Sequence, residues 1–259
     1  MSETPRPRAS EGDPGTGLPQ RRTGHAFAHI TPLRSDERPP QTPRGARRPD
    51  PGGRPGTIPP VPGRPAILSA ACVLLFALTA WQVLASGPLL AVDESLSRVL
   101  LRSVPDAVTE RLADLGNVPV AVPVLLAAMA YALYRGARRA VLAAGAAMLL
   151  VPALVVPLKL WTARPGPLEP WAAGYFPSGH TATAMVAYGC AALLLSPYAR
   201  RARRGAAAAP GAAAVLLTVA TALGLVLRGF HWPLDVLASV LLCTPLLLWV
   251  RHGVRRDRG

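Results

Sequence analysis

The chain has 259 residues, of which 51% are hydrophobic, and a formal net charge of +14. Its apolar residues are concentrated in runs long enough to cross a bilayer core of about 30 Å, and too little polar surface lies between them for a soluble all-α protein. Its basic residues cluster beside these runs. This arrangement argues against nucleic-acid binding and favours a membrane protein whose arginines report orientation and contact anionic lipids.

The first 64 residues differ in kind from the rest. Residues 1–64 hold eleven arginines and six acidic residues, are rich in Pro and Gly, and show no hydrophobic period. Such a segment cannot bury enough apolar surface to offset its conformational entropy, so we predict a disordered cytoplasmic tail. His25 and His29 lie four residues apart in this tail without further ligands, and they predict no metal site.

The remaining sequence predicts an all-α fold. We expect a six-transmembrane helical bundle in one domain over residues 65–250, followed by a basic cytoplasmic tail at 251–259. The expected spans lie at about 66–86, 118–134, 140–160, 180–196, 208–227 and 232–250. The cysteines all lie inside apolar runs and show neither disulfide nor metal-ligand spacing; they are Cys72, Cys190 and Cys243.

The loop between the first two spans carries its own pattern. Residues 92–117 place apolar side chains near helical spacing among charges, which predicts one or two helices on the membrane surface. We interpret these helices either as a packed cap over the bundle or as a lid that controls lipid access.

Basic clusters indicate the orientation. With six spans, the arginines of the tail and of three further clusters all fall on one side, which the positive-inside rule makes cytoplasmic. These clusters are Arg135/Arg138/Arg139, Arg200/Arg201/Arg203/Arg204 and Arg251/Arg255/Arg256/Arg258. Both termini are therefore expected inside the cell, and the loops at the other ends of the spans outside it.

Three short stretches at the outer ends of spans hold most of the polar chemistry. They are Lys159–Pro165 after the third span, Phe176–His180 before the fourth, and Arg228–Asp235 between the fifth and sixth. Placing charge at span ends avoids a cost of about 2.5–3.5 kcal/mol per residue at mid-bilayer. A lysine, two arginines, two histidines and an aspartate at one membrane level suit the binding of a phosphate and its transfer through an imidazole.

The basic residues of these stretches allow two interpretations. Lys159 is the sole lysine among 28 basic residues, which fits a site that needs a compact ammonium group rather than a planar guanidinium. Lys159 and Arg164 are also compatible with side chains that snorkel to the membrane surface and anchor a span.

The second stretch predicts an anion site at the start of a helix. Ser178 suits the N-cap position, and Gly179 lets an anion approach the backbone amides at the positive helix end. His180 then points at the group that leaves the phosphate. A helix cap without further function is the alternative interpretation.

The third stretch pairs an imidazole with a carboxylate. His231 and Asp235 are four residues apart, so they share one face of a helix that begins near Phe230. The carboxylate can accept the Nδ1 proton and leave Nε2 free as a nucleophile. A structural His–Asp pair is the alternative, although an acid one turn into an apolar helix requires a partner.

The Pro177-Ser178-Gly179-His180 motif and the His231-x-x-x-Asp235 motif resemble those of the type 2 phosphatidic acid phosphatases, which share their site with vanadium haloperoxidases. The resemblance covers about residues 92–250, and six spans are also what it implies. By position, it implies His231 as the nucleophile that forms a phosphohistidine, Asp235 as its orienting acid, and His180 as the acid that protonates the leaving group. It assigns phosphate binding to Lys159, Ser178 and Gly179, and it implies no metal or other cofactor.

This sequence departs from the family pattern at both arginines. The first motif is Lys, six residues, then Arg-Pro; that spacing falls on Gly166-Pro167, whereas Arg164-Pro165 lies two residues earlier. The third motif begins Ser-Arg, five residues before the histidine, and Gly224 and Leu225 occupy those positions. Arg228 shares a helix face with Leu225, so we expect it, with Arg164, to bind phosphate.

The sequence therefore predicts a lipid phosphate phosphatase embedded in the plasma membrane with its active site facing outward. Its expected substrate is a phosphorylated membrane lipid with a terminal phosphate beside an apolar tail. Three lipids fit this description: a polyprenyl diphosphate such as undecaprenyl diphosphate, phosphatidate, and phosphatidylglycerol phosphate. A phosphotransferase with the same site is one alternative. A non-catalytic lipid-phosphate binder or transporter is another, although such a protein has no need of two site histidines.

Overall fold

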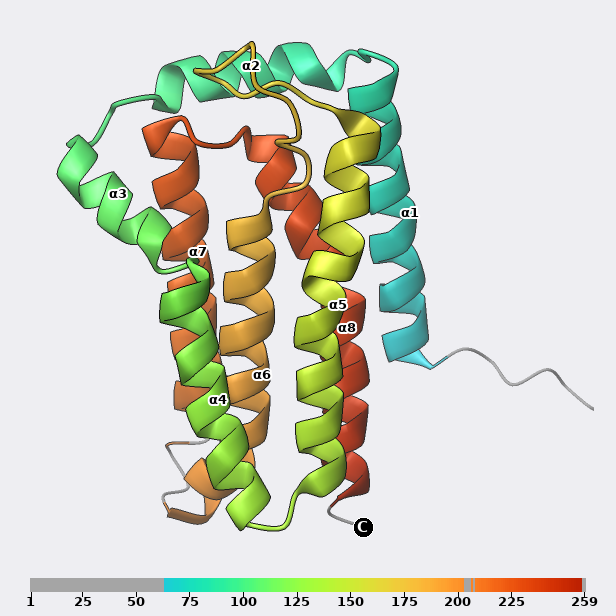
Figure 1. The fold of residues 1–259 in the computed structure, drawn as a ribbon. Helices are drawn as coiled ribbons and strands as arrows, with labels where there is room; N and C mark the ends of the chain where they lie inside the picture. The colour runs from blue at the N-terminus through green and yellow to red at the C-terminus, as the bar shows by residue number, and fades with distance from the viewer. Residues whose placement is uncertain (1–62, 203–205, 207, 258–259) are drawn as a thin grey trace, which may run out of the picture. The chain divides into compact units, whose positions relative to one another are not determined.

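The computed structural model describes residues 63–202, 206 and 208–257 (Figure 1). Nearly all of the tail expected at 1–64, with His25 and His29, lies outside the described residues. Arg203, Arg204 and Arg258 also lie outside them.

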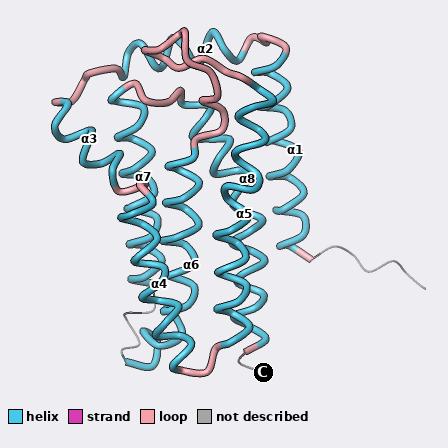
Figure 2. Tube along the Cα trace, in the orientation of Figure 1, coloured by secondary structure: helices cyan, strands magenta, loops and turns pink. Residues whose placement is uncertain are grey.

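Six helices of the described residues are long and apolar enough to cross a membrane, as the sequence predicted. They run roughly along one another in Figures 1 and 2. They lie at α1 Arg64–Leu84, α4 Val118–Tyr134, α5 Arg138–Thr162, α6 Gly179–Ala202, α7 Ala209–Arg228 and α8 Pro233–Arg256, and the span that contains α4 begins at Asp106, in the preceding helix. The chain is therefore a multi-pass membrane protein.

Local sequence explains where these helices begin and end. α1, α4, α7 and α8 each have proline in the first two positions, where a missing N–H costs nothing. α7 ends at Arg228 and is capped by Gly229 with φ of 78°, a left-handed conformation that glycine adopts without strain. This turn brings the chain directly back into α8.

Two shorter helices form in the loop predicted to contain them. α2 spans Leu89–Leu100 and crosses one end of the bundle, and α3 spans Asp106–Asp114 beside α7 (Figure 1). α3 approaches α7 closely at Gly224, where an added Cβ would lie 2.5 Å from the backbone nitrogen of Ala113. Gly224, which stands where the family motif has serine, thus permits this contact.

Small side chains let the spanning helices approach closely. α6 packs against α4, α5, α7 and α8, and its buried face is largely alanine. An added Cβ at Gly189 of α6 would lie 2.8 Å from the side chain of Leu247 on α8. Close backbone approach of this kind is typical of helix packing in membranes, where dispersion replaces the hydrophobic effect.

The outer surface of the bundle is apolar. Leu74, Leu142 and Leu216, from three different helices, are 70%, 73% and 69% exposed. Such a surface would aggregate in water, whereas lipid chains solvate it.

The expected boundary at residue 250 is interior to α8. The helix continues to Arg256 because Val250 and Val254 remain buried, and an added Cβ at Gly253 would lie 3.3 Å from Ala143 of α5. Asp257 then accepts a hydrogen bond of 2.7 Å from the amide of Ala140. Residues 251–256 are thus a packed helix end rather than a separate tail.

Candidate active site

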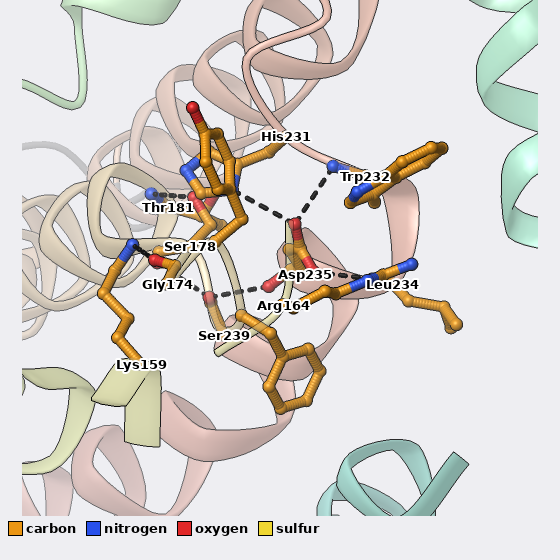
Figure 3. Close-up of polar contacts among 12 residues, drawn as sticks. Lys159, Arg164, Gly174, Ser178, Thr181, His231, Trp232, Leu234, Asp235 and Ser239 are labelled. Atoms are coloured by element: carbon orange, nitrogen blue, oxygen red, sulfur yellow. Dashed lines mark hydrogen bonds and ion pairs between the residues drawn. The ribbon is translucent and has the colours of Figure 1, made fainter. Parts of the chain in front are cut away.

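The three predicted stretches meet at the end of the bundle that α2 crosses (Figures 1 and 3). The end of α5 supplies Lys159, the start of α6 supplies Ser178 to His180, and the turn between α7 and α8 supplies His231. The packing of these helices brings residues that are far apart in sequence to one level.

His231 and Asp235 form the predicted pair. Nδ1 of His231 lies 3.2 Å from Oδ2 of Asp235, and the backbone amide of Trp232 donates to the same oxygen at 3.1 Å. Asp235 is fully buried and His231 is nearly so. An ionised carboxylate accepts hydrogen bonds only, so Nδ1 carries the proton and Nε2 has its lone pair available.

Ser178 caps α6 as predicted, and its hydroxyl is used in doing so. Its Oγ accepts hydrogen bonds from the amide and the hydroxyl of Thr181 at 3.3 and 3.1 Å, and the side chain is fully buried. The amides of Gly179 and His180 follow at the first helical positions, where an α-helix has no internal acceptor for them. These amides are donors that an anion at this helix start could approach, and the Ser178 hydroxyl keeps its own hydrogen as a further donor.

Lys159 lies beside this helix start. Its Nζ donates a hydrogen bond of 2.6 Å to the carbonyl of Gly174. A Cβ added at Gly179 would lie 3.9 Å from Cε of Lys159, an ordinary contact distance. Glycine at 179 thus leaves open space between the ammonium group and the helix amides.

His180 has a partner that sequence reasoning missed. Its Nε2 lies 2.7 Å from Oδ1 of Asn117, whose own Nδ2 donates to Asp114 at 2.8 Å. The amide group of Asn117 is thereby oriented with its oxygen toward His180. The one available signal was the position of Asn117, a polar residue directly before a predicted span.

Tyr175 forms a wall beside His231. The two rings meet edge to face with their centres 5.6 Å apart, and the phenol donates to Glu169 at 2.5 Å. Burial, and then the hydrogen bond and negative charge of Glu169, raise the pKa of Tyr175 to about 12. The phenol therefore stays protonated near neutral pH and does not serve as a base there.

Arg164, which we predicted to bind phosphate, contacts two carboxylates. Its Nη1 contacts Oδ1 of Asp235 at 2.6 Å and its Nη2 contacts Oδ2 of Asp93 at 2.5 Å. Asp93, on α2, was not singled out from the sequence. Burial raises the pKa of Asp93, against the opposing effect of the Arg164 guanidinium and the Leu234 amide.

Arg228 is likewise not brought to the other site residues. Its Nη1 lies 3.5 Å from Oδ2 of Asp106 on α3, and its guanidinium stacks 5.3 Å from the ring centre of Phe230. Leu225 is buried, and its carbonyl accepts the amides of Phe230 and His231 at 2.8 and 3.3 Å. Because it contacts Asp106 on α3, the guanidinium of Arg228 is not among the groups that line the cavity of the site.

We therefore expect Arg228→Ala to leave turnover per folded molecule within a few-fold of the wild type while lowering the melting temperature. The reason is that the ion pair with Asp106 is partly exposed and joins α7 to α3. The test measures turnover after size-exclusion chromatography in detergent, with Asp106→Asn as the matched variant. A loss of about 100- to 1,000-fold in turnover at unchanged stability would instead indicate a contact with the transition state.

One cavity of about 700 Å³ contains the polar groups that do converge. Its polar end is lined by Lys159, Gly179, His180, His231 and Asn117. The rest of its wall is apolar and comes from α4 and α5; it includes Val118, Pro119, Met148, Leu149, Val151, Pro152, Val155 and Val156.

A sequence model described as the PAP2 superfamily matches residues 140–258, which contain all three stretches. Residues 140–258 belong to the PAP2 superfamily. Asp93 and Asn117, which contact the PAP2 site residues, lie outside the matched segment.

The fold agrees with this assignment. A solved structure titled as the first transmembrane PAP2-type phosphatidylglycerolphosphate phosphatase from Bacillus subtilis superposes with a TM-score of 0.62 at 20% sequence identity. The match covers 73% of this chain and 96% of the other. At this identity the likeness establishes a shared PAP2 fold. None of the curated proteins compared with the chain matches it.

Proposed function

We propose that this PAP2 protein is a membrane lipid phosphatase that removes a terminal phosphate through a phosphohistidine at His231. One observation supports this most directly: two imidazoles, an ammonium group and a helix start line one end of a cavity whose remaining walls are apolar. The polar end suits a phosphate and the apolar end suits the first part of a lipid tail.

The first step transfers the phosphoryl group to the protein. The lone pair on Nε2 of His231 forms a bond to phosphorus as the bond from phosphorus to the lipid oxygen breaks. Protonated His180 gives its proton to that leaving oxygen. Lys159 and the amides of Gly179 and His180 face the negative charge of the phosphoryl oxygens, and Asp235 stabilises the positive charge on the imidazole ring.

The second step restores the enzyme. His180, now neutral, accepts a proton from a water molecule as the water oxygen bonds to phosphorus and the bond from phosphorus to Nε2 breaks. Inorganic phosphate leaves, and His231 is again neutral. These steps use side chains and water alone, so we expect activity to persist in EDTA.

The proposal is tested with purified protein in detergent micelles. Phosphatidate, phosphatidylglycerol phosphate and a polyprenyl diphosphate are supplied separately, and released phosphate is measured with and without EDTA. Release from one of them supports the phosphatase. Binding of all three without release would indicate a binder, and release only with an added alcohol acceptor would indicate a phosphotransferase.

We also propose that the site faces the outside of the cell. The helix ends opposite α2 carry the basic clusters, with Arg135, Arg201 and Arg256 among them, and the positive-inside rule places these ends in the cytoplasm (Figure 1). Lipid phosphates of the outer leaflet would then reach the cavity.

Cysteine labelling on intact cells checks this orientation. Trp171→Cys, in the exposed loop between α5 and α6, is expected to react with an impermeant maleimide, whereas Arg256→Cys is not. The native cysteines at 72, 190 and 243 are buried, which keeps the background low. Detergent-permeabilised cells should label both variants, and the reverse pattern on intact cells would place the chemistry in the cytoplasm.

A further inference from the structure

A buried chain of charges joins the crossing helix α2 to the nucleophile. Asp93 contacts Arg164, Arg164 contacts Asp235, and Asp235 contacts Nδ1 of His231, at 2.5, 2.6 and 3.2 Å (Figure 3 draws the links from Arg164 onward). The side chains of Asp93, Arg164 and Asp235 are 1%, 5% and 0% exposed. Solvent screening is weak at such burial, so each charge depends on its neighbours.

The geometry of Arg164 leaves little of it for a substrate. Its two terminal nitrogens are each taken by a different carboxylate, and its guanidinium also stacks 5.2 Å from the ring of Trp232. The cavity wall includes Lys159 and His231 but not Arg164. The planar guanidinium of arginine holds two carboxylates at once in a fixed geometry, which the compact ammonium group of lysine does not provide.

The carboxylate of Asp93 has a second contact, through its other oxygen. Oδ1 of Asp93 accepts the amide of Leu234 at 2.8 Å, near the start of α8. Asp93 therefore fixes both Arg164 and the first turn of the helix that bears Asp235. α2 thus determines where the carboxylate behind His231 lies.

The charges also balance the proposed intermediate. Two carboxylates and one guanidinium give this chain a net charge of −1 when His231 is neutral. When Nε2 bonds to phosphorus, Nδ1 keeps its proton and the ring becomes cationic, so ring and chain together become neutral. Removal of the charge of Asp93 would leave the same state at +1 in a buried setting, which raises its free energy.

We propose that Asp93 and Arg164 are positioning residues, which hold Asp235 and thereby His231, and that Arg164 does not bind the substrate phosphate. This inference rests on the proposed phosphoryl transfer through His231. It extends the catalytic machinery to α2, outside the segment that matches the PAP2 superfamily.

Asp93→Asn tests the inference with little change in shape. Asparagine keeps the volume and an acceptor for Leu234 but removes the charge. We expect turnover to fall about 10- to 100-fold, by analogy with the loss of a partner that orients a metal-ligating histidine, with KM within about threefold of the wild type. Glu94→Gln, the same chemical change at the next, exposed residue of α2, is the matched control and should leave both constants unchanged.

The pH profile adds a readout that a merely structural role would not move. Asp93→Asn removes one negative charge from the buried chain that ends at the nucleophile, so the acidic limb of turnover should move to lower pH. The ionisable groups around His231 are Asp235, Arg164, Asp93, Lys159, His180 and Tyr175, and Asp93→Asn changes only one of them. An unmoved limb together with unchanged turnover would overturn the inference.

Arg164→Gln separates positioning from phosphate binding. If Arg164 positions Asp235, turnover falls while inhibition by inorganic phosphate stays within about threefold, and the double variant with Asp93→Asn is no worse than Arg164→Gln alone. The double variant also removes the charge of Asp93 with that of Arg164, which leaves one buried carboxylate without an arginine instead of two if Arg164→Gln folds poorly. Inhibition weakened tenfold or more, with additive losses in turnover, would assign Arg164 to the phosphate instead.

A measurement without turnover distinguishes failure of this inference from failure of the proposed function. The ¹⁵N spectrum of labelled histidine, assigned with His231→Asn, reports which ring nitrogen of His231 carries the proton. We expect the Nδ1–H form in the wild type and a mixture in Asp93→Asn. A wild type that hydrolyses no lipid phosphate but gives this result would contradict the function alone, whereas identical spectra would contradict the positioning role.

Discussion

His231→Ala is expected to abolish nearly all turnover, with a loss of about 10⁴-fold or more. The variant has no nitrogen to attack phosphorus, and the remaining groups can only bind the phosphate and orient water. Cavity shape and the charge of Lys159 are retained, so KM should change much less than turnover. Phosphate release from the lipid identified as substrate measures both constants.

His252→Ala provides the matched control, because His252 is an exposed histidine near the other end of the same helix, α8. It should behave as the wild type. Rapid denaturation of the wild type during turnover should also trap an acid-labile phosphoryl group on protein, and His231→Ala should trap none. Turnover near the wild-type rate in His231→Ala would rule out the proposed nucleophile.

Lys159→Met is expected to lower turnover by about 100- to 1,000-fold, by analogy with the loss of one donor to a developing negative charge. The effect is large because Lys159 is the one lysine or arginine side chain that lines the described cavity, while Arg164 and Arg228 face carboxylates. Methionine keeps the length and apolar stem of lysine, so the expected loss reflects the missing ammonium group.

Lys159→Arg gives the sharper comparison. A guanidinium is wider and longer than an ammonium group, so its donors would not lie where Nζ now donates to the carbonyl of Gly174 at 2.6 Å. We therefore expect Arg to restore less than a tenth of the wild-type turnover although the charge is kept. Full activity in Lys159→Arg would show that charge alone is required there.

The membrane architecture could be predicted from the sequence because it depends on local properties. Run length and composition placed six spans, and helical spacing in residues 92–117 placed α2 and α3. The last turn of α8 lies in the segment that we predicted as a basic tail because of its arginines. Its helix depends on the packing of Val254 and on the contact of Asp257 with α5, which no local pattern reports.

Contacts in the site could be predicted where both residues lie in one short stretch of chain, and not where they join two distant helices. The capping role of Ser178 follows from helical geometry. Asp235 lies in the first turn of α8 and contacts His231, which precedes the helix start at Pro233 rather than sharing a helix face with Asp235. The partners Asp93 and Asn117 join residues 71 and 63 positions away, and neither belongs to a motif. The orientation of Arg164 depends on its contact with Asp93, so it could not be predicted without knowing that contact.

The apolar part of the cavity bears on how such an enzyme would meet its substrate. The cavity wall includes Leu149 and Val156 of α5, which are 74% and 51% exposed on the outer surface of the bundle. A lipid could thus pass sideways from the bilayer with its tail still among its neighbours. The quantity that sets the rate would then be the mole fraction of substrate in the membrane plane, so dilution with neutral lipid would slow the reaction although the bulk concentration is unchanged.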